Sequence, residues 1–197
     1  MAEPDVGAPI DANGNLTSDG TRTFEWDVRN QLTAVNLGSH RTEFVYDGLR
    51  RQVRMVEEDE HTTASDGYFL WCGKRVCEER SDSGTFVVSR KFALGEQIGG
   101  LTRFVVADHL GTLREVTGAS GALQAQYDTD PWGRRTLVLG SDSLATGYAG
   151  HRWHDQSKLS LAPFRAYDAD LGRWLSADPL KFQRCSLPDN PWAQIVL

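Results

Sequence analysis

The sequence lacks the marks of several common classes of protein. Its three cysteines, Cys72, Cys77 and Cys185, form no CxxC pair and have no histidine at a metal-ligand spacing. We therefore expect reduced cysteines in strands, with neither a disulfide framework nor a metal site. No apolar run is long enough to span a bilayer, and the start Met-Ala-Glu-Pro-Asp has no signal-peptide pattern.

A concentrated basic face is also missing. The net charge is −6, and the arginines Arg50, Arg51 and Arg54 are soon followed by the acidic run from Glu57 to Glu60. Nucleic-acid binding requires clustered positive charge, so no nucleic-acid partner is predicted. The Gly-rich stretch 94–100 lacks the lysine of a phosphate-binding loop. His109, His151 and His154 stand at no metal spacing. No cofactor is predicted.

No window of the sequence carries a helical apolar stripe. The chain of 197 residues has nineteen glycines and only two methionines, with many β-branched and aromatic residues. This composition favours strands, and the length suits one domain or two. The stretch Asp108 to Arg135 predicts a hairpin, because apolar residues alternate on both sides of the turn 117–121. The predicted fold class is all-β.

Aromatic residues recur along the chain with a period near twenty. They stand 18 to 23 residues apart, at Trp26, Tyr46, Tyr68, Phe86, Phe104, Tyr127, Tyr148 and Tyr167. This period suits one antiparallel β-hairpin per repeat, with each aromatic residue in a strand. A single hairpin cannot bury its apolar face, so neighbouring repeats must stack into an open strip.

Four of these aromatic residues are followed at once by aspartate, at Asp27, Asp47, Asp128 and Asp168. A carboxylate at the first turn position can accept the backbone N–H two residues on, which predicts a turn after Tyr46-Asp47. A corner at 169–172 would set Asp168 opposite Arg173 and Tyr167 opposite Trp174 across the last hairpin.

Further turns are predicted at Asn13-Gly14, at Gly73-Lys74 and at Asp82-Ser83-Gly84. The repeat is entered in mid-stride at Asp11, so the first strand should leave an open sheet edge. Residues 1–10 show no strand pattern, and residues 180–197 lose the alternation.

The motifs together resemble the Rhs/YD-repeat proteins. The resemblance covers Asp11 to Pro179 and is carried by 108–112 (DHLGT), 127–134 (YDTDPWGR), 150–152 (GHR) and 164–179 (FRAYDADLGRWLSADP). It implies YD-repeat hairpins over 11–107 and an RHS repeat-associated core region over 108–179. Members of this bacterial family are large polymorphic toxins or surface proteins. Their repeats form a long, curved β-strip that spirals into a hollow shell around a C-terminal toxin.

The core domain of the family resembles a self-cleaving aspartyl peptidase that frees the toxin. The matching positions here are Asp168, Asp178, Arg173 and Arg165. Such chemistry needs two carboxylates with separated pKa values, one protonated and one activating water. After Asp178-Pro179 the chain lacks the second DPxG motif at which family members are cut.

Three functions are therefore carried forward. The first is a structural shell segment without catalysis, whose partners are other YD-repeat segments and an enclosed toxin. The second is an aspartyl autopeptidase. The third is a cell-surface or cell-wall carbohydrate-binding protein, because six tryptophans and five tyrosines could stack on sugar rings. As part of a larger parent the chain would be secreted or on the cell surface, and made alone it would stay in the cytoplasm.

Overall fold

The computed structural model describes residues 9–141 and 144–179. Twelve strands form one antiparallel sheet in chain order, and four later strands form a second, smaller one. The large sheet contains β1 (Arg22–Trp26), β2 (Leu32–Leu37), β3 (His40–Tyr46), β4 (Gln52–Asp59), β5 (Thr62–Cys72), β6 (Arg75–Arg80), β7 (Val87–Phe92), β8 (Gly95–Ile98), β9 (Leu101–Ala107), β10 (Leu113–Gly118), β11 (Leu123–Thr129) and β12 (Arg135–Gly140). The small sheet contains β13 (Arg152–His154), β14 (Leu159–Leu161), β15 (Ala166–Asp168) and β16 (Arg173–Trp174).

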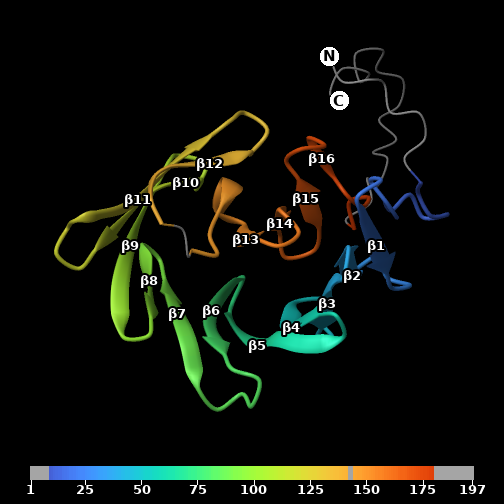
Figure 1. Ribbon diagram of the computed structural model, residues 1–197, viewed down its shortest axis with the longest axis horizontal. Helices are drawn as coiled ribbons and strands as arrows, with labels where there is room; N and C mark the ends of the chain where they lie inside the picture. The colour runs from blue at the N-terminus through green and yellow to red at the C-terminus, as the bar shows by residue number, and fades with distance from the viewer. Residues whose placement is uncertain (1–8, 142–143, 180–197) are drawn as a thin grey trace, which may run out of the picture.

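The large sheet is a curved strip, and the small sheet lies inside the curve. In Figure 1 the strip runs in an arc from β1 on the right, through β5 to β7 at the bottom, to β9–β12 on the left. Strands β13–β16 sit on the concave side of this arc. Every pair of consecutive strands in the strip is an antiparallel hairpin, so the predicted all-β strip of hairpins is confirmed.

Two clusters of buried side chains hold the inner sheet against the strip. The larger one joins β1–β3 to β14, β15 and the residue after β16, and contains Leu16, Phe24, Leu32, Val35, Phe44, Leu159, Leu161, Ala166 and Leu175. The smaller one joins β10 and β11 to the segment before β13, and contains Leu113, Val116, Ala125, Tyr127 and Leu144. The alternation of β3 shows why: Thr42 and Phe44 face the core, while Val45 faces solvent.

The aromatic period corresponds to every second strand, as one hairpin per repeat requires. The expectation that each aromatic residue lies in a strand is wrong at two positions. Phe86 lies in the loop before β7, and Tyr148 begins the short 3₁₀ turn η1 (Tyr148–Gly150). The spacing of the aromatic residues gives the length of the repeat, but it does not determine which residues of each repeat lie in a strand. Within the described residues, no helix is long and apolar enough to cross a membrane.

The open edge of the strip lies at the end opposite to the predicted one. The outer edge of β1 is bonded to residues 17–19, through Phe24 N–H to Thr17 O and Asp19 N–H to Arg22 O. At the other end, β12 has β11 as its only strand partner among the described residues. Its apolar side chains Leu137, Val138 and Leu139 are all exposed.

The prediction of reduced cysteines is wrong for one pair. Cys72 and Cys77 form a disulfide, and their Cα atoms lie 5.6 Å apart. The predicted turn Gly73-Lys74 joins β5 to β6, and this hairpin brings the two cysteines together. The pair was missed because its spacing has meaning only once the turn between them is known. Cys185 lies outside the described residues.

The predicted boundary at 107/108 falls between β9 and β10, which pair within the one large sheet. The chain leaves the strip after Gly140 and enters the small sheet at Arg152. The division into repeats and core region stays a prediction about family segments. The expected irregular start at 1–10 falls mostly outside the described residues, as does the tail at 180–197.

Candidate functional site

Five loops headed by aspartate share one pattern of hydrogen bonds. In each, the Asp side chain accepts the backbone N–H groups of the residues two and four positions on, at 2.8–3.0 Å. The fourth residue of each loop, three positions after the aspartate, has a positive φ, a conformation that glycine adopts without strain. The loops are 11–15, 27–31, 47–51, 108–112 and 130–134.

The loop 47–51 shows what each side chain does. Asp47 Oδ1 accepts the N–H groups of Leu49 and Arg51, and Asp47 Oδ2 accepts a bond from Arg51 Nε at 2.8 Å. The turn predicted after Tyr46-Asp47 is therefore confirmed. After Tyr127 the loop is headed by Asp130 instead, because Asp128 lies in β11 with its side chain exposed.

These bonds predict a loss of stability in acid. The backbone N–H of Arg51 holds the pKa of Asp47 below its ordinary 3.8. At Asp108 and Asp130 desolvation raises the pKa, but the bonds from Thr112 and Arg134 outweigh it, so both pKa values are also lowered. The unfolded chain takes up protons near 3.8 and the folded chain only below it. Stability should therefore be complete above about pH 4 and fall as the pH drops through the folded pKa values.

Urea unfolding midpoints measured from pH 6 to pH 2 check this prediction. Replacing Asp47, Asp108 and Asp130 together with asparagine should lower the midpoint at neutral pH and flatten its decline in acid. An equally steep decline in the triple variant would show that other groups cause it.

The carboxylate of Asp168 is buried and fully occupied. Its Oδ1 accepts the N–H groups of Asp170 and Leu171 at 2.8 and 2.9 Å. Its Oδ2 is bonded to Arg22 of β1, whose guanidinium also binds Asp19. Arg22 therefore fastens the inner sheet to the first hairpin. Arg22 and Asp19 were missed from the sequence, because they stand well over a hundred residues away from Asp168.

Asp178 has a different arginine. Arg165 Nη2 lies 2.9 Å from Asp178 Oδ2, and the Arg165 guanidinium lies 4.1 Å from the centre of the Trp174 ring. The structure thus brings together two of the four predicted residues, Arg165 and Asp178. It also sets Asp168 opposite Arg173 and Tyr167 opposite Trp174 in backbone register, as predicted. The Tyr167 and Trp174 rings meet edge to face at 5.3 Å.

Each carboxylate of the predicted pair is neutralised by its own arginine. A shared-proton dyad needs two carboxylates that act directly on each other. Here one carboxylate binds Arg22 and two backbone N–H groups, and the other binds Arg165. This arrangement is suited to ion pairing and to holding the turn at 169–172.

A second polar cluster joins the inner sheet to the strip. His154 of β13 contacts Glu57 of β4 through Nε2 at 2.7 Å and Ser157 through Nδ1 at 2.6 Å. The order serine, histidine, carboxylate is that of a hydrolase triad. Ser157 is only 2% exposed, and its backbone carbonyl accepts a bond from Arg22. This serine is therefore buried in the contact between the inner sheet and the strip. The described residues hold no group of three or more His, Cys, Asp or Glu side chains suited to a metal ion.

The turn 130–134 of the strip contacts the turn 168–172 of the inner sheet. Tyr167 Oη donates to Trp132 O at 2.7 Å, and Arg134 Nε donates to Asp170 Oδ1 at 3.0 Å. The Trp132 ring covers Gly172, where an added Cβ would lie 3.0 Å from Trp132 Cδ1. The two turns are thus joined by packing of the Trp132 ring on Gly172 and by the bond from Arg134 to Asp170.

The two edges of the strip differ in chemistry. The turns that join the strands form two rows, one at each end of the strands. We call the row of turns after odd-numbered strands the odd edge, and the row after even-numbered strands the even edge. Five of the six tips of the odd edge carry large exposed apolar side chains, at Val28, Leu49, Leu94, Leu110 and Trp132, and the sixth is the turn Gly73-Lys74. The tips of the even edge are small or charged, at 38–39, 60–61, 82–84, 99–100 and 119–121, with Phe86 and Leu101 at the strand starts beside them.

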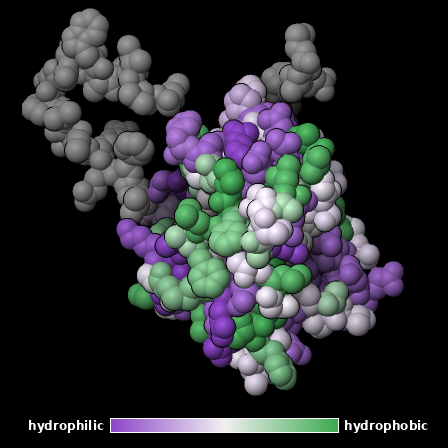
Figure 2. Space-filling model, turned by 90° about the vertical axis from the view of Figure 1, so that its left-hand side faces the viewer, coloured by the Kyte–Doolittle hydropathy of each residue, from purple (hydrophilic) through white to green (hydrophobic). Residues whose placement is uncertain are grey.

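Charge differs between the edges in the same way. Beside its apolar tips the odd edge exposes Arg29 and Arg50, whereas the even edge exposes Glu60 and Asp82. Figure 2, which faces the side where β9 and β11 lie, shows apolar side chains reaching the surface among polar ones. The odd edge therefore repeats the chemistry of Trp132 and Arg134, and the even edge resembles the glycine and carboxylate that they contact.

Comparison with known proteins extends this description. No family model matches the chain. It is 25% identical over 183 residues to the tRNA3(Ser)-specific nuclease WapA of Bacillus spizizenii, covering 89% of this chain and 8% of that protein. It is 28% identical over 174 residues to the probable deoxyribonuclease RhsB of Dickeya dadantii, covering 80% and 12%. It is 23% identical over 217 residues to the double-stranded DNA deaminase toxin A of Burkholderia cenocepacia, covering 89% and 15%.

Solved structures show the same fold. The crystal structure of TcdB2-TccC3-TEV matches with a TM-score of 0.69 at 16% identity, covering 89% of this chain and 10% of that one. The Photorhabdus luminescens Tc holotoxin pore matches with a TM-score of 0.68 at 17% identity, covering 89% and 10%. The chain thus spans only a small part of the length of its relatives.

The class defined by the fold is an open antiparallel strip of hairpins that curls around a small inner sheet. Within that class, the relatives in sequence and the neighbours in structure confirm the predicted resemblance to Rhs-type proteins.

Proposed function

We propose that the chain is a structural segment of a toxin-enclosing β-strip shell and has no catalysis of its own. The carrying observation is the docking of turn 130–134 on turn 168–172, which fixes the inner sheet in the curve of the strip. Leu49 and Leu110, at the tips of two other turns of the odd edge, are 68% and 58% exposed, so this edge presents further apolar tips to a partner. Further stretches of YD-repeat strip are the partners that fit it.

Edge-to-edge docking explains why the two edges are unlike. Apolar tips and arginines on the odd edge of one strip can contact glycines and carboxylates on the even edge of a second strip. Two strips can therefore stack only with the odd edge of one against the even edge of the other. An enclosed toxin domain would then lie on the concave side, beyond the inner sheet. Export as part of a larger parent protein fits the Cys72–Cys77 disulfide, because disulfides persist in oxidising compartments.

The alternative, an aspartyl autopeptidase using Asp168, Asp178, Arg173 and Arg165, is favoured only by the position of these residues in the family motif. A carbohydrate site draws less support. Arginine guanidinium groups lie over the rings of Trp71, Trp153 and Trp174 at 4.1–5.9 Å, so one face of each ring is occupied.

Sedimentation velocity over a wide range of protein concentrations tests the shell proposal. We expect the average mass to rise with concentration, and Leu49→Glu with Leu110→Glu to suppress the rise. Val45→Glu, an exposed apolar residue on the outer face of β3, is the matched control and should associate like the parent chain. A chain that stays monomeric throughout, or a control that behaves like the edge variant, would contradict edge docking.

A further inference from the structure

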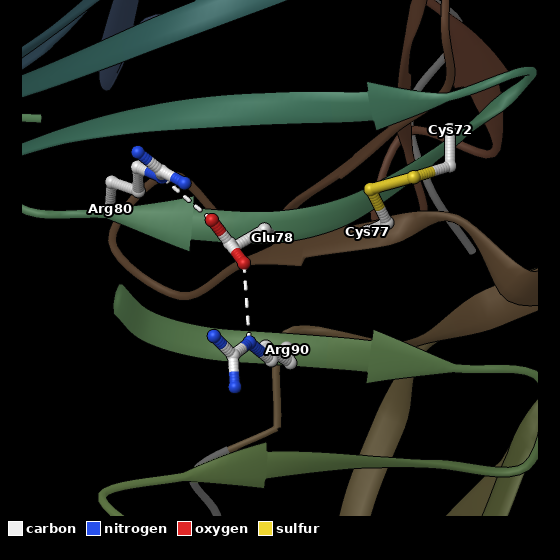
Figure 3. The surroundings of a disulfide bond; sticks show 5 residues. All are labelled: Cys72, Cys77, Glu78, Arg80 and Arg90. Carbon is white, nitrogen blue, oxygen red and sulfur yellow. Dashed lines mark hydrogen bonds and ion pairs between the residues drawn. A yellow bond between two sulfur atoms is a disulfide. The ribbon is translucent and has the colours of Figure 1, made fainter. Parts of the chain in front are cut away.

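The disulfide lies at the exposed tip of a hairpin. Cys72 is the last residue of β5, and Cys77 lies in β6, two residues beyond the start of that strand. Figure 3 shows the bond crossing between the two strands beside the turn. Residues 72–75 are all exposed, so the tip of the hairpin that carries Cys72 is open to solvent.

A β-bulge places Cys77 within reach of Cys72. Trp71 pairs with Val76 and Leu70 pairs with Glu78, so Cys77 has no partner of its own in β5. The bulged residue is released from the ladder and can turn towards the end of the neighbouring strand.

The charges around the bond are mainly positive. Lys74 and Arg75 belong to the turn that the disulfide closes. The nearest acid in sequence, Glu78, is bound by Arg80 Nε at 2.6 Å and by Arg90 Nε at 3.2 Å (Figure 3). These bonds, that of Arg80 first, hold the pKa of Glu78 below its ordinary value. An exposed, electropositive setting favours thiolates and speeds thiol–disulfide exchange.

The hairpin does not depend on the bond for its position. The disulfide joins residues only five apart, and such a short loop gives less stabilisation than a long one. Strand β5 is held independently, since Trp71 Nε1 donates to Gln52 O at 2.8 Å and Arg51 lies over the Trp71 ring. The bond can therefore open without unfolding the strip.

We propose that Cys72 and Cys77 are a reversible thiol–disulfide exchange site whose reaction partner is a dithiol. A thiolate of the dithiol attacks the Cys72 sulfur, the S–S bond breaks, and Cys77 leaves as a thiolate that takes up a proton. The second thiol of the dithiol then attacks the mixed disulfide and releases Cys72. Two electrons and two protons pass to the protein, and the dithiol becomes a disulfide.

The test uses the full chain with Cys185→Ser, so that only this pair reports. Dithiothreitol is added, samples are quenched with iodoacetamide at intervals, and intact masses are measured. We expect no added group before reduction and two after it, with an unchanged far-UV circular dichroism spectrum. Lys74→Gln with Arg75→Gln should slow reduction by roughly threefold or more, while the remote control Lys158→Gln should not.

Four outcomes would overturn the proposal. Two groups added before reduction would mean that the thiols do not pair. No added group after reductant would mean that the bond is inaccessible. Loss of the strand spectrum on reduction would make the bond a structural staple. Equal rates in the parent chain and the Lys74/Arg75 variant would remove the role of the charges. None of these results bears on edge docking, which is measured by association.

Discussion

Replacing Asp168 with asparagine is expected to lower the free energy of unfolding by about 3 kcal/mol. Asparagine keeps an oxygen for the N–H groups of Asp170 and Leu171, so the turn survives. What is lost is the charge that faces Arg22, a guanidinium with only 11% of its side-chain surface exposed. Arg22 keeps Asp19, which places the expected loss at the lower end for a broken buried ion pair. Urea unfolding at neutral pH measures it.

Asp178→Asn is the matched control for this variant. The Asp178 side chain is 41% exposed, and its bond to Arg165 should contribute only about 0–1 kcal/mol. A catalytic pair would predict similar stability for both variants, with an effect on cleavage instead. If the two asparagine variants unfold at the same urea concentration, the Arg22–Asp168 bond does not hold the inner sheet.

Replacing Leu175 with alanine should cost about 2–5 kcal/mol of stability. Leu175 is fully buried in the cluster that joins the inner sheet to β1–β3, and its carbonyl accepts the backbone N–H of Leu16. The smaller side chain leaves a cavity between two sheets whose backbones are fixed by their own ladders, so the cavity closes only in part.

Leu171→Ala controls for the chemistry of this change. Leu171 belongs to the same hairpin but is 44% exposed, and the substitution should change stability by no more than about 0.5 kcal/mol. Thermal and urea unfolding of both variants decide the matter. Equal effects would mean that the inner sheet is not packed on the strip through this cluster.

The local structure could be predicted because its causes lie close together in the sequence. An aspartate two residues before an N–H donor, as at Asp47 and Leu49, defines a turn on its own. Once the corner at 169–172 is known, the strand period places Tyr167 opposite Trp174. Stacking of hairpins into an open strip follows from their inability to bury a face alone.

The contact between the two sheets could not be predicted, because the residues that form it share no sequence motif. His154 and Glu57 are 97 residues apart, and each reads as an ordinary strand residue. The cysteine pair was hidden for the opposite reason. Cys72 and Cys77 are close in sequence, but they face each other only because a bulge follows the turn. The expected open edge at β1 failed because residues 17–19 fold back on it.

We propose that Asp168 and Asp178 form ion pairs with arginines and take no part in cutting the chain. The most direct test is the intact mass of the purified chain, followed through prolonged incubation beside the Asp168→Asn and Asp178→Asn variants. A structural role predicts one unchanged mass of 21.9 kDa for the parent chain and no loss of material in any sample. Two fragments whose masses sum to that of the chain plus one water, absent from both variants, would contradict it.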